Sequence, residues 1–160
     1  MGYTTEFDGC FYFNKPLDDD TYNLLVGLAS TRRIKRFGLS PDYGLDGEFY
    51  FKSDSENFGQ ENDGTILDRN SPPSNQPGLW LQWMPTEDRL HLVWDGGEKF
   101  YYYVEWLEYL IKKILEPKGY SLSGSVDWAG EDDYDRGTIS LHDNLMRIER
   151  KNHPTRGRAF

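Results

Sequence analysis

The chain has 160 residues and a formal net charge of −9, and 16% of its residues are aromatic. This length is typical of one domain with its own core, without metals or disulfides to stabilise it. No apolar run approaches the ~20 residues that a membrane-spanning helix needs, and the first residues lack the pattern of a signal peptide. The single cysteine, Cys10, excludes an internal disulfide. We therefore expect one cytoplasmic domain with an aromatic-rich core and no membrane partner.

Charge is distributed unevenly along the chain. From Arg147 onward there are five basic residues and one acid, Glu149, so the preceding part has 13 basic and 26 acidic residues. A surface this acidic repels nucleic acid and suits a basic protein surface, although it also serves solubility alone. Nucleic acid is therefore not an expected partner, whereas a protein is.

The first half of the chain predicts a strand, a helix and a long loop. Residues 7–13 are rich in aromatic side chains, as strands are. Three aspartates at 18–20 can cap a helix, whose apolar face follows at helical spacing over residues 22–29. We expect the basic residues Arg32, Arg33, Lys35 and Arg36 at the C-terminal end of this helix, where positive charge is favoured.

Residues 39–78 form a long insertion dominated by Gly, Pro, Asp, Ser and Asn. Only residues 49–51, with the sequence FYF, have the pattern of a strand. Long loops in compact domains are commonly either functional or disordered, and the sequence leaves both readings open.

The second half predicts two hairpins, a helix and a strand. The helix is the clearest element, because apolar residues recur at helical spacing from Phe100 to Ile114 before Pro117 and Gly119 end it. Clean alternation over residues 120–128 predicts a strand with one buried face. The two hairpins have strands near residues 79–84 and 90–94, and near residues 138–142 and 145–148.

The first six elements follow the ferredoxin-like β-α-β-β-α-β order, in which two helices cover one face of an antiparallel sheet. The expected fold class is therefore α+β, with a C-terminal hairpin added and the insertion placed after the first helix. Residues 1–151 form the domain, and residues 152–160 form a frayed basic tail.

A second aromatic row on the predicted helix is one candidate binding surface. Tyr102, Trp106 and Tyr109 lie beside the main apolar stripe, and one sheet face cannot readily cover both rows. Either the central loop packs over this row, which is the favoured interpretation, or the row is exposed and binds a partner.

The Gly96-Gly97 turn is a second candidate, because it lies between a strand and the predicted helix. Backbone N–H groups at a helix N-terminus can bind an anion such as phosphate. Together with Arg32, Arg33 and the central loop, this turn would form a nucleotide pocket. Bases could also stack on the aromatic row, with Arg32, Arg33 and Arg36 nearby to meet phosphates. Glycines also occur at such turns simply because the backbone requires positive φ.

Nothing in the sequence points to catalysis or a cofactor. His91, His142 and His153 lack metal-ligand spacing, and no nucleophile lies in a recognised motif. The acidic turn at residues 131–135 lacks the spacing of a calcium loop and is better interpreted as solvated. We therefore expect no cofactor, no metal and no catalytic residues.

Several segments resemble a family of short uncharacterised bacterial and bacteriophage proteins. They are MGYTTEF (residues 1–7), TRRIKR (31–36), QPGLW (76–80), WDGGEKF (94–100), VEWL (104–107), the strand and turn over 124–135, and GTI (137–139). The resemblance implies no known activity. What it implies is a setting in which small phage-linked proteins often bind and inhibit host defence or regulation.

Three hypotheses follow. The first is a non-catalytic binding protein, in the phage or mobile-element setting an inhibitor that contacts a host protein. The second is a protein that binds or sequesters a nucleotide near the Gly96-Gly97 turn. The third is a structural protein that forms a homodimer.

Overall fold

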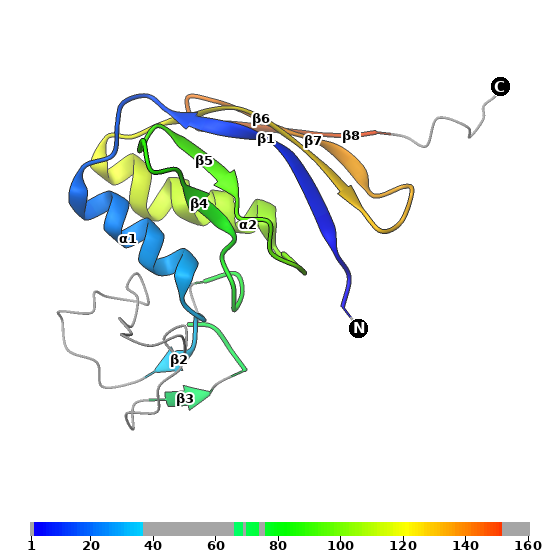
Figure 1. The fold of residues 1–160 in the computed structure, drawn as a ribbon, viewed down its shortest axis with the longest axis horizontal. Coiled ribbons are helices and arrows are strands. Elements are labelled where there is room, and N and C mark those ends of the chain that lie inside the picture. The colour runs from blue at the N-terminus through cyan, green and yellow to red at the C-terminus, as the bar shows by residue number, and fades with distance from the viewer. Residues whose placement is uncertain (1, 37–65, 69, 74–75, 152–160) are drawn as a thin grey trace.

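The computed structural model describes residues 2–36, 66–68, 70–73 and 76–151. It is a mixed α+β structure in which two helices lie on one face of a sheet (Figure 1). The elements in chain order are β1 (Thr5–Phe13), α1 (Asp19–Ser30), β2 (Lys35–Arg36), β3 (Ile66–Asp68), β4 (Trp83–Pro85), β5 (His91–Trp94), α2 (Tyr103–Tyr109), β6 (Leu122–Gly130), β7 (Arg136–His142) and β8 (Leu145–Arg150).

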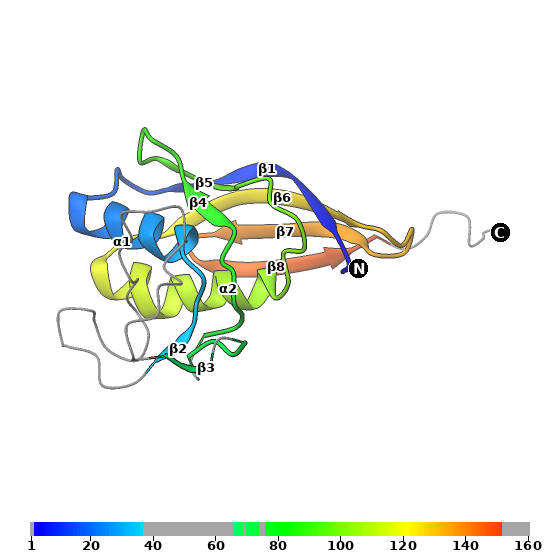
Figure 2. The same cartoon turned by 60° about the horizontal axis from the view of Figure 1, so that its bottom comes forward.

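The main sheet has six strands in the order β4-β5-β1-β6-β7-β8, and every pairing in it is antiparallel. The expected α+β class is confirmed at this level. The C-terminal hairpin β7–β8 does not stand apart, because β7 pairs with β6 and extends the sheet (Figure 2). β2 and β3 pair in a separate two-stranded sheet that the sequence did not predict.

α1 begins where the aspartates predict it. The Asp18 carboxylate accepts a hydrogen bond from the Thr21 N–H at 2.7 Å, and this bond lowers the pKa of Asp18. The helix ends at Ser30 without a basic residue in its last turn, and Lys35 and Arg36 lie in β2. Placing the basic cluster at the helix end was therefore wrong. The Arg33 N–H donates to the Leu79 carbonyl at 2.7 Å, so the chain leaves the helix to run beside a later segment.

α2 begins later than its apolar stripe suggests. Phe100 is buried, but it lies before the helix, and Tyr102 has left-handed backbone angles (φ 61°, ψ 37°) that a helix interior excludes. The helix continues as a π-helix over Leu110–Leu115 and a 3₁₀ turn over Glu116–Lys118. Gly119, at φ 83°, ends it as predicted.

Two glycines allow the central strands β1 and β6 to approach closely. Gly9 and Gly124 have φ of 112° and 113°. A Cβ at Gly9 would lie 2.6 Å from the Ser125 carbonyl oxygen, and one at Gly124 would lie 2.8 Å from the Cys10 carbonyl oxygen. Only glycine fits both positions without a shift of backbone, and the two strands bend together in this region (Figure 1).

The core between sheet and helices is built around Trp83, which is fully buried. Its ring centroid lies 5.2 Å from Phe7, 5.5 Å from Phe11 and 5.3 Å from Phe100, each in an edge-to-face arrangement. Its indole N–H donates to the Tyr103 carbonyl at 2.9 Å. Trp83 thus joins β1, β4 and the start of α2, and the expected aromatic core is present.

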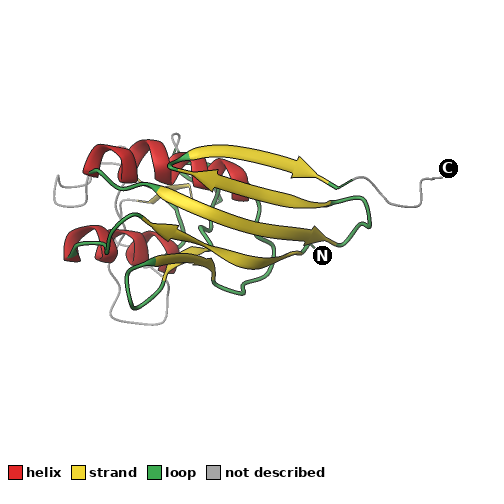
Figure 3. Cartoon of the chain, turned by 90° about the horizontal axis from the view of Figure 1, so that it is seen from above, coloured by secondary structure: helices red, strands yellow, loops and turns green. Residues whose placement is uncertain are grey.

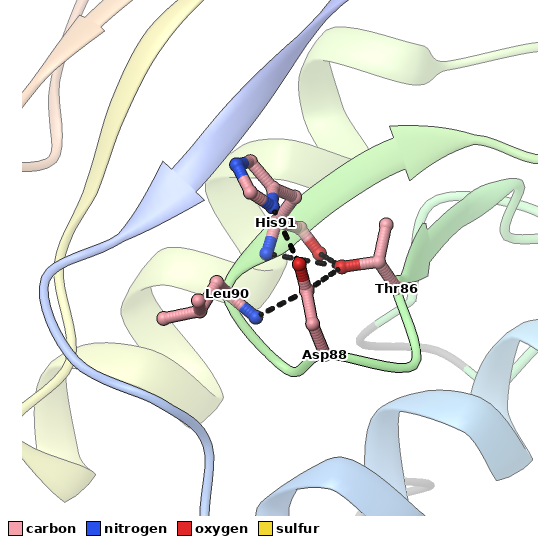
Figure 4. A network of polar contacts seen from close by, with 4 residues as sticks. All are labelled: Thr86, Asp88, Leu90 and His91. Carbon is pink, nitrogen blue, oxygen red and sulfur yellow. Dashed lines mark hydrogen bonds and ion pairs between the residues drawn. The ribbon is translucent and has the colours of Figure 1, made fainter.

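The turn between β4 and β5 is held by Asp88 (Figure 4). Its carboxylate accepts hydrogen bonds from the Thr86 hydroxyl and the Leu90 N–H, and these bonds lower the pKa of Asp88. The neighbouring Arg89 pairs with Asp19, and its guanidinium carbon lies 4.6 Å from the Tyr22 ring centroid. The hairpin is therefore tied to the first turn of α1.

Some predicted elements lie outside the described residues. These are the strand expected at 49–51, most of the insertion over residues 39–78, and the tail over residues 152–160.

Replacing the central tryptophan tests the role of the core. Trp83→Ala should lower the free energy of unfolding by about 3–5 kcal/mol, because it removes a fully buried ring and leaves a cavity. Tyr12→Ala, on the opposite sheet face where the side chain is half exposed, should stay within about 0.5 kcal/mol of the parent. Urea unfolding measures both, and a loss below about 1 kcal/mol for Trp83→Ala would contradict this packing scheme.

Candidate functional site

A cavity in the described part of the chain lies between the end of the insertion and the segment before α2. Its volume is about 450 Å³. We call it the aromatic pocket, because aromatic and proline side chains make up much of its lining. It is lined by Asn70, Pro72, Pro77, Gly78, Leu79, Trp80, Glu98, Lys99, Tyr101 and Tyr102.

The first wall, residues 76–80, is fixed by a buried polar network. Arg33 is only 3% exposed, and its Nε donates to the Gln76 side-chain oxygen at 3.1 Å. The Gln76 amide nitrogen donates to the Tyr109 hydroxyl at 3.1 Å, and a second Arg33 nitrogen donates to the Thr31 hydroxyl at 2.8 Å. The end of α1, the insertion and α2 are thereby joined through one chain of hydrogen bonds.

The second wall, residues 98–102, has an unusual backbone. Lys99 and Tyr102 have φ of 59° and 61°, a region that side chains other than glycine seldom adopt. The Tyr101 hydroxyl accepts a hydrogen bond from the Tyr3 N–H at 3.0 Å, which attaches this wall to the start of β1. Tyr101 and Tyr102 remain 46% and 56% exposed, so both rings are accessible at the cavity.

The pocket has cations at its edge. Lys99 is exposed and lines the cavity beside Glu98. The Arg32 guanidinium carbon lies 5.7 Å from the Trp80 ring centroid, and an Arg32 nitrogen lies 3.5 Å from the Asn70 side-chain oxygen. A ring held between Trp80 and the tyrosines would thus lie near positive charge.

The structure divides the predicted aromatic row. Trp106 is fully buried and Tyr109 is 6% exposed, whereas Tyr102 faces the pocket. The favoured interpretation, that the loop packs over the row, is confirmed for Trp106 and Tyr109. A Cβ built on Gly78 would lie 3.5 Å from the Trp106 indole nitrogen. The exposed-surface alternative fails for these two residues, because residues 76–78 lie over them.

The predicted basic cluster is also divided. Arg32 contacts two residues of the pocket lining, but Arg33 is buried in the polar network and its guanidinium cannot meet a phosphate in solvent. Arg36 lies in β2. Burying an arginine is costly unless its N–H groups are hydrogen-bonded, and the Gln76 and Thr31 oxygens accept two of these bonds.

The Gly96-Gly97 turn is not at a helix N-terminus, so the predicted anion site is wrong in its geometry. α2 begins at Tyr103, and the Gly97 N–H already donates to the Asp95 carboxylate at 2.8 Å. Gly96 has φ of 85°, which supports the alternative that glycine is present for the turn itself. Neither glycine lines the aromatic pocket, although Glu98 and Lys99 directly after them do.

The acidic turn after β6 has a structural role. Asp135 accepts hydrogen bonds from the Tyr3 hydroxyl and the Trp128 indole N–H, both at 2.9 Å. The Glu131 carboxylate accepts from the Thr4 N–H at 2.6 Å. These hydrogen bonds fasten the turn to the start of β1, so the turn is not merely solvated.

Asp135 also affects Tyr103. Burial, with the nearby Asp135 charge, raises the pKa of Tyr103 to about 12.

The described residues hold no metal-binding cluster, and the grouping of Thr86, Asp88 and His91 is not arranged as a triad. No group of three or more metal-ligating side chains is found among the described residues. Thr86, Asp88 and His91 lie together, but the Thr86 hydroxyl bonds the Asp88 carboxylate and the His91 backbone rather than the imidazole (Figure 4). A triad requires the histidine between nucleophile and carboxylate, so this cluster is a turn and not a nucleophile site.

Searches against protein-family profiles, curated protein sequences and solved structures return no significant match. Among the described helices, none has the length and apolar character needed to cross a membrane. The resemblance to short phage and bacterial proteins therefore stays a prediction.

Sequence reasoning missed most of the pocket. Trp80 and Tyr101 were not proposed as site residues, because they lie in segments predicted as strand and helix, and Lys99 was considered only as part of the segment around the Gly96-Gly97 turn. The available signal was the dense aromatic content of residues 100–103 beside a Pro-Gly-Leu-Trp segment in the same chain. Nothing in either segment alone indicates that the two face each other.

The polar network can be tested through Gln76. Gln76→Ala removes an acceptor from buried Arg33 and a donor from Tyr109, so it should lower the free energy of unfolding by about 1–3 kcal/mol. Tyr109→Phe, which deletes only the hydroxyl, should cost about 1 kcal/mol or less. Urea unfolding of both variants provides the comparison. Equal stability of Gln76→Ala and the parent would show that residues 76–80 are not held by this network.

Proposed function

We propose that this protein is a binding protein without catalytic function, and that the aromatic pocket is its contact site for a partner protein. The observation that supports this most directly is the convergence of Trp80, Tyr101 and Tyr102 on one cavity of about 450 Å³. Ligand pockets are usually 300–1,000 Å³, largely apolar, and have a few polar groups that fix orientation. Here Lys99, Glu98 and Asn70 supply those groups.

The residue types support recognition. Tyrosine and tryptophan give large rigid contact areas with one polar end, and they dominate the energetics of protein interfaces. The two tyrosines are half exposed although they lie beside a well-packed aromatic core. Large aromatic rings left in a concave, partly open site favour insertion of an apolar side chain from a partner.

The backbone of the pocket supports the same proposal. Two bulky residues with positive φ, Lys99 and Tyr102, line one cavity. Such conformations cost of order 1–3 kcal/mol each and cluster at binding and active sites. Tyr102 adopts this conformation directly before α2, and it lines the cavity.

The partner that suits the rest of the molecule is a basic protein. The chain before Arg147 has twice as many acidic as basic residues, 26 against 13, and an acidic surface attracts a positively charged partner and speeds its association. If the resemblance to small phage-linked proteins holds, the partner is a cytoplasmic host protein of a defence or regulatory system. The function of this protein is then to inhibit that host protein.

A nucleotide is the second candidate ligand, and the cations at the pocket favour it. A base stacked on Trp80 or Tyr102 would place its phosphates near Lys99 and Arg32. This differs from the earlier hypothesis, because Gly96, Gly97 and Arg33 take no part. The acidic character of the chain makes the nucleotide the weaker of the two candidates.

We also propose that part of the fold is ferredoxin-like. That part consists of β1, α1, β4, β5, α2 and β6. It is supported by the order β4-β5-β1-β6 within the larger sheet.

The test is capture from a bacterial lysate with matched variants. The parent should retain a host protein in stoichiometric amount, and Trp80→Ala with Tyr102→Ala should reduce the retained amount about tenfold or more, as truncation of central aromatic anchors does. Tyr12→Ala removes an aromatic ring of similar exposure from the other sheet face and should retain the partner. Circular dichroism of the variants confirms that they are folded.

Two other outcomes would contradict the proposal in different ways. Equal retention by the pocket variant and the parent would contradict the proposed contact site. A parent that retains no protein, but whose melting temperature rises with millimolar nucleotide and not after Trp80→Ala, would favour the second candidate.

A further inference from the structure

The two edges of the six-stranded sheet differ in how they are protected. β4 has three residues, includes Pro85, and packs against α1. β8 has six residues, no proline or glycine, and pairs with β7 without a bulge. Natural proteins usually shield an edge with short strands, prolines, bulges or charged side chains, because a free edge pairs with other chains. The β4 edge is short and contains a proline, whereas the β8 edge has of these features only the charges of Arg147, Glu149 and Arg150.

β8 is the outermost strand of the sheet, as Figure 3 shows. Five of its six residues are exposed. They include two large apolar side chains, Leu145 at 75% and Ile148 at 42% exposure. Among the described residues only β7 pairs with this strand.

The register of the hairpin fixes which backbone groups of β8 are free. Asp143 and Asn144, at φ 48° and 72°, form a two-residue turn between the facing residues His142 and Leu145. In such a hairpin the residues after the turn alternate between inward and outward hydrogen bonding. The Lys151 N–H donates to the Arg136 carbonyl of the β7 side at 2.9 Å. Residues 145, 147 and 149, which are an even number of positions from Lys151, therefore also bond toward β7. Met146, Ile148 and Arg150 therefore direct their N–H and C=O groups away from β7.

We propose that β8 pairs with β8 of a second copy of this chain, antiparallel and centred on Ile148. In this register Ile148 faces Ile148 of the second copy in a hydrogen-bonded pair. The outward backbone groups of Met146 meet those of Arg150 in the same way. The two sheets then join into one continuous sheet across a twofold axis, which is the commonest symmetry of protein dimers.

Charge complementarity selects this register. Pairing around Ile148 places Arg147 opposite Glu149 of the second copy, twice across the twofold axis. These are non-hydrogen-bonded pairs, in which side chains lie closest and opposite charges stabilise the sheet. Arg147 and Glu149 already lie on the same face of β8, with 3.7 Å between their charged atoms. The dimer thus extends an existing ion pair into a group of four charges.

The neighbouring registers are less favourable. Pairing centred on Arg147, Glu149 or Arg150 would oppose two like charges directly, and like charges in that position destabilise a sheet. Pairing centred on Met146 would oppose Leu145 to Arg147 and leave Glu149 beyond the paired region. Ile148 is therefore the centre that covers the exposed isoleucine and neutralises both charges.

The pairing can be tested with two charge variants that complement each other. Arg147→Glu should be monomeric because its copies would oppose carboxylates. Glu149→Arg should be monomeric because its copies would oppose guanidinium groups. An equimolar mixture should dimerise, because each variant supplies the charge that the other lacks. Arg136→Glu, with the same change of net charge on the neighbouring strand, should behave as the parent does.

Sedimentation equilibrium measures these outcomes. A strand pairing of this size is a small interface, so the parent should dimerise with a dissociation constant between ~1 µM and ~1 mM. Ile148→Pro removes an outward N–H that β7 does not use, and it should abolish dimerisation while the far-ultraviolet spectrum is kept. A parent that stays monomeric at 1 mM would overturn the proposal, as would a mixture that stays monomeric while the parent dimerises.

Discussion

A buried guanidinium is the constraint on which the candidate site depends. Arg33 is 3% exposed, and a charge taken out of water is tolerated only when its donors are satisfied. Its bonds to Gln76 and Thr31 bring the exit of α1 against the end of the insertion, and Gln76 continues the chain to Tyr109 on α2. One wall of the aromatic pocket exists because this arginine turns inward.

The other wall depends on the aromatic core. Trp83 fills the space beneath β1, and its indole N–H fixes the carbonyl of Tyr103 at the start of α2. The helix therefore begins at a fixed point, and Tyr102 before it is held in a left-handed conformation that presents its ring to the cavity. A rigid core thus supports a strained and partly exposed segment, which is the arrangement that preformed binding sites need.

The pocket and the β8 edge are separate surfaces made by different residues. The pocket suits a single inserted side chain or ring, whereas the edge offers backbone hydrogen bonds and paired charges. β8 lies at one edge of the six-stranded sheet, and none of its residues lines the pocket. A dimer joined at β8 would hold two pockets in one assembly, so a partner with two matching sites would be bound more tightly than either pocket alone allows.

Sequence reasoning predicted elements whose patterns are local. Alternation over residues 120–128 located β6, and the apolar stripe after Phe100 located α2, because burial on one face imposes a period on each. The inward turn of Arg33 could not be predicted, since arginine is seldom buried and its partner Gln76 lies in a segment without a pattern. The same holds for Tyr102, whose positive φ results from tertiary packing, and for the short pairing of β2 with β3. Of these three features, Tyr102 lines the pocket, and Arg33 is bonded to Gln76 in one of its walls.

Amide hydrogen exchange of Arg33 tests most directly whether the pocket wall is docked in solution. Its N–H donates to the Leu79 carbonyl at 2.7 Å, so this proton reports on the junction between α1 and the wall. We predict that it exchanges as slowly as the amides of β1 and β6, because opening it requires exposing the guanidinium network. Exchange at the rate of an unstructured chain, with β1 and β6 still protected, would contradict a preformed aromatic pocket.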